Sequence, residues 1–132
     1  MRSITVKSIE QFSIAMPFVE KLRTRFGEEP FKTAVLIKIT TEDGLVGWGE
    51  APVEIHPGYS SETMGTADHV LREFLIPALL GKTVQSPTDV PELLSHTRGH
   101  PLAKHSLEQA VWDAWSQANG LSIAQAFAYH LP

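Results

Sequence analysis

Every β-strand pattern in this sequence precedes every helical pattern, and this order limits the possible folds more than any other feature. Residues 4–16 alternate apolar and polar side chains, as expected for a long, half-buried strand. Residues 33–41 and 45–50 form two more strand patterns, and the turn sequence Glu42-Asp43-Gly44 joins them as a hairpin. Strands segregated from helices predict an α+β fold, in which a three-stranded antiparallel meander packs against three to four helices.

The same alternation predicts which strand residues face the core. They are Ile4, Val6, Phe12, Ile14 and Met16 on the first strand and Val35, Ile37 and Ile39 on the second. Ser8 and Glu10 interrupt the first row, which indicates a bulge near Ile9. Gly47 and Gly49 weaken the third strand by propensity, so we expect another element to pack closely against its backbone.

A long amphipathic helix is the first of the helical patterns. Apolar residues follow a 3.6-residue period over residues 67–79. We expect Ser60 or Ser61 to cap this helix, with Glu62 in its first turn. Pro77 should kink the helix or tighten its last turn.

The remaining helices are separated by clear stop signals. They are expected over residues 89–96, 101–118 and 122–131. Asn119-Gly120 ends the second of these, and Ser122 with Gln125 forms a capping box that opens the third. Residues 81–87 are interpreted as a linker. Two other segments, residues 17–32 and 51–60, have no period and are predicted to be long loops, which in compact domains are usually functional or mobile.

Size and composition exclude several classes of protein. At 132 residues the chain forms one domain, and it is too short for a TIM barrel of roughly 200–250 residues. A net charge of −4 argues against a nucleic-acid-binding protein, and the absence of cysteine excludes disulfides and thiolate sites. No apolar stretch is long enough to cross a membrane, and the first ten residues lack signal-peptide features, so we expect a cytoplasmic protein.

Motifs for metal or phosphate binding are incomplete. His96, His100 and His105 lie within ten residues, but Gly99 and Pro101 divide them between different elements, so a zinc site is not expected. The glycines of the hairpin match no phosphate-binding fingerprint.

Two other groups allow more than one interpretation. Glu50, Glu54 and Glu62 fit either acid–base chemistry or ordinary solvated carboxylates, of which the second is more common. Trp112 and Trp115 flank an apolar helix stripe and indicate either the edge of the core or an interface.

Four blocks of sequence occur in one order and together cover nearly the whole chain. They are residues 22–27, residues 42–50, residues 57–62 with 69–72 and 75–80, and residues 99–113. In this arrangement they resemble the N-terminal capping domain of the enolase superfamily, in its muconate-lactonising subgroup. The motifs Tyr-Ser-Ser-Glu and Pro-Ala-Leu-Leu in the third block are most similar to the o-succinylbenzoate synthase / N-acylamino acid racemase branch.

This resemblance implies a role for the chain. In the family, the capping domain precedes a modified TIM barrel that supplies acid–base lysines and three carboxylates for Mg²⁺, which stabilises an enediolate. We therefore expect residues 1–132 to be a single capping domain without its barrel, inactive alone and holding neither catalytic nor metal-binding residues. The implied partners are the C-terminal barrel and a small carboxylate substrate, with a homo-oligomer as a further possibility.

Two alternatives to this role stay open. The runner-up among enzymes is the capping domain of a muconate cycloisomerase or a dipeptide epimerase, which would share the domain but differ in loop chemistry. From another class, it fits a free-standing interaction module that self-associates through the surface a barrel would cover.

The resemblance also identifies candidate substrate-binding residues. Residues 17–32 and 51–60 match the two loops that close over the barrel and set specificity in the family. They hold the candidates Arg23, Arg25, Phe26, Glu54 and Tyr59. Phe26 and Tyr59 fall on positions that line the substrate pocket, and Glu54 falls on a wall position that is commonly apolar. The two arginines either attract a succinyl carboxylate or are ordinary exposed side chains.

Overall fold

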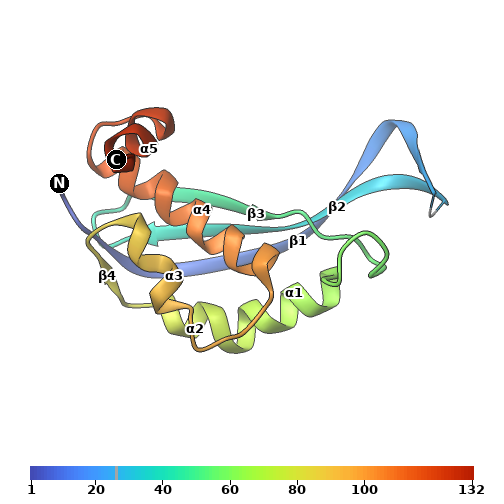
Figure 1. Ribbon diagram of the computed structural model, residues 1–132, viewed down its shortest axis with the longest axis horizontal. Coiled ribbons are helices and arrows are strands. Elements are labelled where there is room, and N and C mark those ends of the chain that lie inside the picture. Colours follow the sequence, from blue (N-terminus) through green and yellow to red (C-terminus); the bar gives the residue numbers. More distant parts are fainter. Residues whose placement is uncertain (26) are drawn as a thin grey trace.

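A four-stranded antiparallel sheet forms the centre of the computed structural model, which describes residues 1–25 and 27–132. Its strands are β1 (Ile4–Thr24), β2 (Gly27–Thr41), β3 (Val46–Ala51) and β4 (Thr83–Val84), in the order β3-β2-β1-β4 (Figure 1). The predicted α+β class and the meander of the first three strands are confirmed. The fourth strand lies in the segment interpreted as a linker, because two residues are too few for a strand pattern.

A bulge in β1 reverses which side chains face the core. The pairing of β1 with β2 shifts between Val6 and Ser8, close to the predicted position. Ile4 and Val6 are buried as expected, but Phe12 and Met16 are 40% and 50% exposed. One extra residue moves all later side chains of a strand to the other face. The expectation that Phe12 and Met16 face the core was therefore wrong, and Ile14 is half-buried, although Val35, Ile37 and Ile39 on β2 are fully buried.

One continuous helical segment follows the sheet and contains a widened turn. It comprises α1 (Met64–Val70), the π-helical η1 (Leu71–Leu75) and α2 (Ile76–Leu79). Neither Ser60 nor Ser61 caps it: Thr63 does, in a capping box with Thr66. The N–H of Ile76 bonds to the carbonyl of Leu71 five residues earlier. Pro77 has no N–H to donate to the preceding turn. The helix therefore widens into a π-helical turn before Pro77, rather than tightening there as one of the two expectations had it.

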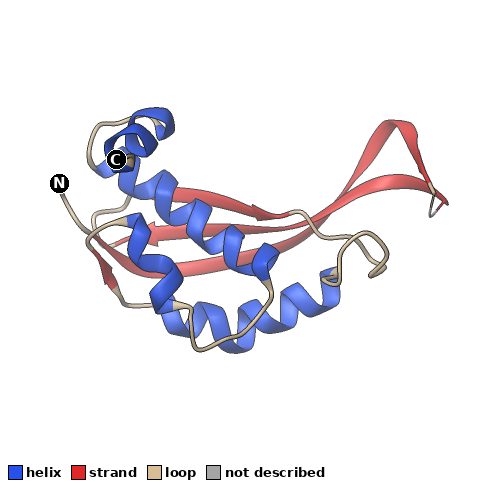
Figure 2. Ribbon diagram, in the orientation of Figure 1, coloured by secondary structure: helices blue, strands red, loops and turns tan. Residues whose placement is uncertain are grey.

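The later helices agree with the sequence pattern except for one. They are η2 (Pro87–Asp89, a 3-10 turn), α3 (Val90–Leu93), α4 (Pro101–Ala118) and α5 (Ile123–His130), shown in Figure 2. The stop after α4 and the capping box of α5 are confirmed. The helix expected over residues 89–96 is only one α-turn after a 3-10 turn. No helix within the described ranges is long and apolar enough to cross a bilayer.

Helix α4 lies directly against β3, and the glycines of that strand permit the contact. A Cβ atom at Gly47 would overlap the backbone of Ala110 and Ala114, and one at Gly49 would overlap the carbonyl of Ser106. The close approach predicted from the two glycines is therefore confirmed.

Polar side chains of α4 also form hydrogen bonds with the backbone groups along the free edge of β3. The bonds run from the N–H of Glu50 to Gln109 (2.8 Å), from the N–H of Trp48 to Asp113 (2.8 Å), and from Gln117 to the carbonyl of Val46 (2.7 Å). Spaced four residues apart, these side chains share one face of the helix. They occupy backbone groups that would otherwise be open to pairing with another strand.

Helix α5 covers the two tryptophans of α4. The Trp112 and Phe127 rings are 4.6 Å apart, and the Trp115 ring lies 5.3 Å from that of His130. The indole N–H of Trp115 donates to the carbonyl of Gln85 at 2.9 Å. Both tryptophans thus lie at the edge of the core, under the last helix.

Candidate functional site

A two-stranded arm extends from the sheet at the end away from α5 (Figure 1). Here β1 and β2 continue to pair through Pro17 with Phe31, Leu22 with Glu29 and Thr24 with Gly27. The prediction of a long loop over residues 17–32 was therefore wrong. Both faces of a projecting ribbon meet solvent, so its side chains need not alternate. A second register shift, between Pro17 and Leu22, removes what periodicity remains.

The arm carries a small cluster of charges near its tip. The Nε of Arg23 lies 3.0 Å from Oε1 of Glu28, and the Nζ of Lys21 lies 3.9 Å from the other oxygen of that carboxylate. Arg23 is 84% exposed, so the pair contributes little to stability. Arg25 lies in the turn between the strands, and Phe26 lies outside the described residues.

A first groove lies between the arm and the segment after β3. Its volume is about 280 Å³. The lining residues include Phe18, Leu22, Phe31, Pro52, Glu54 and Ile55. Aromatic and aliphatic groups thus dominate its walls, as in many sites for small organic ligands.

A second groove, of about 490 Å³, lies between the segment after β3 and the start of α4. Its lining residues include Pro52, Glu54, Tyr59, Glu62, Pro101 and Leu102. Pro52 and Glu54 border both grooves, so the grooves adjoin each other there. Tyr59 is 86% exposed, with its ring available for contact with a ligand or another domain.

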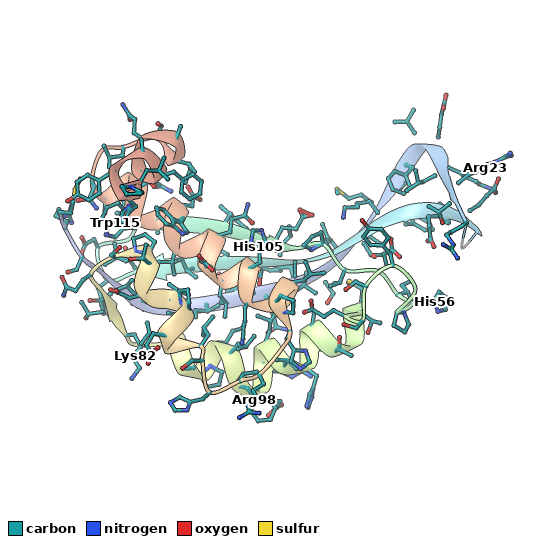
Figure 3. All side chains as sticks on the ribbon, viewed as in Figure 1. Arg23, His56, Lys82, Arg98, His105 and Trp115 are labelled. Carbon is teal, nitrogen blue, oxygen red and sulfur yellow. The ribbon has the colours of Figure 1, made fainter. Side chains whose placement is uncertain are left out.

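The structure brings only some of the predicted site residues together. Glu54 and Tyr59 share the second groove. Arg23 lines neither groove and projects from the arm. It lies at the same end of the molecule as His56 of the loop between β3 and α1, residues 52–63 (Figure 3).

The base of the loop is held by backbone and side-chain bonds. Glu54 and Thr63 form an isolated bridge, and the N–H of Met64 donates to the carbonyl of Glu54 at 2.8 Å. Glu62 is only 4% exposed, and its carboxylate accepts from the N–H groups of Leu102 at 2.8 Å and Ala103 at 3.1 Å. The loop is therefore joined to the start of α4.

The sequence reasoning missed this role of Glu62. It assigned the residue to the first turn of the helix after the loop, whereas Glu62 precedes α1 and caps α4 instead. One signal for the correct partner existed. His100, which stands before Pro101, is a poor N-cap, so the amides of α4 needed an acceptor from elsewhere in the chain.

The resemblance assigns the Mg²⁺ ligands to the barrel rather than to residues 1–132. Across residues 1–25 and 27–132, no three side chains of the types His, Asp and Glu come together in a way that would hold a metal ion. This includes His96, His100 and His105.

Comparisons with known proteins place these features in a family. The model of the mandelate racemase / muconate lactonizing enzyme N-terminal domain matches residues 4–127. An N-succinylamino acid racemase from Amycolatopsis sp is 40% identical over 119 residues, which cover 90% of this chain and 32% of the racemase. An o-succinylbenzoate synthase from Geobacillus kaustophilus is 37% identical over 116 residues, which cover 88% of this chain and 30% of the synthase.

The fold is shared with a solved structure of the same superfamily. A member of the enolase superfamily from Listeria innocua superposes with a TM-score of 0.89 at 28% identity, over 94% of this chain and 33% of that one. The chain thus spans about a third of the length of the relatives it matches.

Proposed function

Since the chain belongs to the mandelate racemase / muconate lactonizing enzyme N-terminal domain family of the enolase superfamily, we propose that it is the substrate-capping domain of a longer, Mg²⁺-dependent enzyme. The proposed reaction is of the o-succinylbenzoate synthase or N-succinylamino acid racemase type, in which a proton is removed α to a carboxylate. The proposed partner is a C-terminal barrel that carries the base and the metal.

The observation that carries this proposal is the pair of adjoining grooves. One is bounded by the arm and the other by the loop, and they meet at Pro52 and Glu54. Two exposed projections around a largely apolar hollow suit a lid, which excludes water and shapes the pocket. In this proposal the lid residues are Arg23, Arg25, Phe26, Glu54 and Tyr59.

The decisive experiment assays the full-length protein that carries this chain. With Mg²⁺ we expect it to dehydrate the cyclohexadiene precursor of o-succinylbenzoate or to racemise N-succinylamino acids, and EDTA should abolish turnover. The panel also includes cis,cis-muconate and L-Ala-L-Glu. Turnover of only one of these two would contradict the proposed reaction and indicate a muconate cycloisomerase or a dipeptide epimerase instead. Residues 1–132 alone should be inactive, and Mg²⁺-dependent turnover by them would contradict the proposal.

Glu54 should influence which substrates the enzyme prefers. Glu54 lines both grooves, and its carboxylate would repel the second carboxylate of an N-succinyl substrate by about 1 kcal/mol. In the full-length enzyme, Glu54→Gln should therefore raise kcat/KM for an N-succinylamino acid by about fivefold. The matched N-acetylamino acid lacks that carboxylate and should change by less than about twofold. An equal change for both substrates would show that Glu54 does not face the succinyl group.

A further inference from the structure

We propose that Glu62 is a positioning residue that fixes the substrate-capping loop by serving as the N-cap of a helix forty residues later. Its effect on catalysis rests on the proposed function, whereas its effect on the loop does not. Three features of the structure support this role: the hydrogen bonds at the start of α4, the closure of the loop base, and the contrast in exposure between Glu62 and Tyr59.

The first amides of α4 depend on Glu62. Pro101 has no N–H, and the residue before it, His100, has a left-handed backbone (φ 54°) and provides no side-chain cap. The N–H groups of Leu102 and Ala103 both donate to the Glu62 carboxylate. The next amide, that of Lys104, bonds the carbonyl of His100 at 3.0 Å. One remote carboxylate thus satisfies both donors that the helix leaves open, and its charge is favourable at a helix N-terminus.

Glu62 also lies at the point where the loop closes. The bridge between Glu54 and Thr63 joins the two ends of the loop, and the N–H of Glu62 donates to Oγ of Ser60 at 3.1 Å. Glu62 is 4% exposed, but Tyr59, three residues earlier, is 86% exposed. A short segment therefore runs from a buried, doubly bonded anchor to an exposed ring. Moving the anchor must move Tyr59, because two residues leave little slack between them.

Glutamine is the informative substitution at this position. Glu62→Gln keeps the shape of the side chain, but its amide has one oxygen, so an NH₂ group would face one of the two N–H donors. Glu62→Asp keeps both acceptor oxygens and the charge on a side chain one methylene shorter. This variant should therefore keep part of the anchoring that Glu62→Gln loses. Glu92→Gln is the matched control, since Glu92 is exposed on α3 and remote from both grooves.

The test measures amide hydrogen exchange and kinetics on the full-length protein, at a temperature where every variant is folded. For Glu62→Gln we expect exchange of the hydrogen-bonded amides of Glu62 and Met64, at the base of the loop, to rise roughly tenfold or more, while that over residues 35–39 stays unchanged. KM for the N-succinyl substrate should rise roughly tenfold with kcat changing less than about threefold, since the chemical groups lie elsewhere. The exchange rates and KM of Glu62→Asp should lie between those of Glu62→Gln and those of the wild type.

Each contrary result has a definite meaning. Unchanged exchange of the Glu62 and Met64 amides overturns the anchoring of the loop by Glu62, and an equal rise over residues 35–39 overturns positioning in favour of general destabilisation. Faster loop exchange with unchanged KM overturns the link to substrate binding. If the wild-type enzyme turns over none of the substrates, the proposed function fails, but the exchange measurement still decides whether Glu62 holds the loop.

Discussion

Replacing Gly49 by alanine is expected to lower the free energy of unfolding by about 3 kcal/mol or more. The new methyl group would overlap the backbone carbonyl of Ser106, and a backbone atom inside a helix cannot move aside as a flexible side chain would. Relief requires α4 to lift from β3, which would also stretch the hydrogen bonds that the strand's N–H groups donate to Gln109 and Asp113. Urea unfolding of the purified protein measures the loss.

Gly65→Ala is the matched control for that prediction. Gly65 lies in α1, and the nearest atom to an added Cβ would be Oγ1 of Thr63 at an ordinary 3.8 Å. Since alanine is the better helix former, this variant should be neutral or more stable by up to about 1 kcal/mol. If Gly49→Ala cost no more than about 1 kcal/mol, the helix would not be seated against the strand as described.

Trp115→Ala should destabilise the protein by about 3–5 kcal/mol. The side chain is 1% exposed, and the substitution removes both its ring contact with His130 of α5 and the hydrogen bond to the carbonyl of Gln85. That carbonyl would be left without its indole donor. We expect the loss to appear in urea unfolding, together with faster amide exchange over α5.

Trp48 provides the comparison for Trp115, because it is the same residue type in a different environment. Its ring is 46% exposed on the sheet face opposite α4, where it contacts Phe12 at 6.2 Å. Trp48→Ala should cost less than half as much as Trp115→Ala, since most of the cost of losing a large side chain comes from burial. Equal losses would mean that the exposed sheet face is covered in solution.

Helix α4 links these predictions to the proposed function. It packs on the glycines of β3, binds the edge of that strand, carries Trp115, and has its first amides capped by Glu62. The loop next to the second groove is therefore fastened to the most buried helix of the domain. A lid built in this way has an exposed tip on a rigid base, which suits a part that must hold its shape over a substrate.

Local patterns in the sequence determined much of this protein. The order of strands and helices predicted the α+β class, Asp43-Gly44 predicted the hairpin, and Ser122 with Gln125 predicted the start of α5. The paired glycines of β3 predicted a close neighbour. Most of these features depend on residues within a few positions of one another. The glycines predict a close neighbour because they have no side chain, so none of these predictions required knowledge of the fold.

The tertiary structure decided what depended on residues far apart in the chain. A single bulge moved Phe12 and Met16 to the outer face of the sheet, because one inserted residue reverses every later side chain. The arm formed as a ribbon without an apolar row, since cross-strand backbone bonds hold it rather than a core. Glu62 gained its role only when folding brought it to the uncapped start of α4, forty residues away. Local propensity describes what a segment can do alone, whereas these three features arise from what lies beside it.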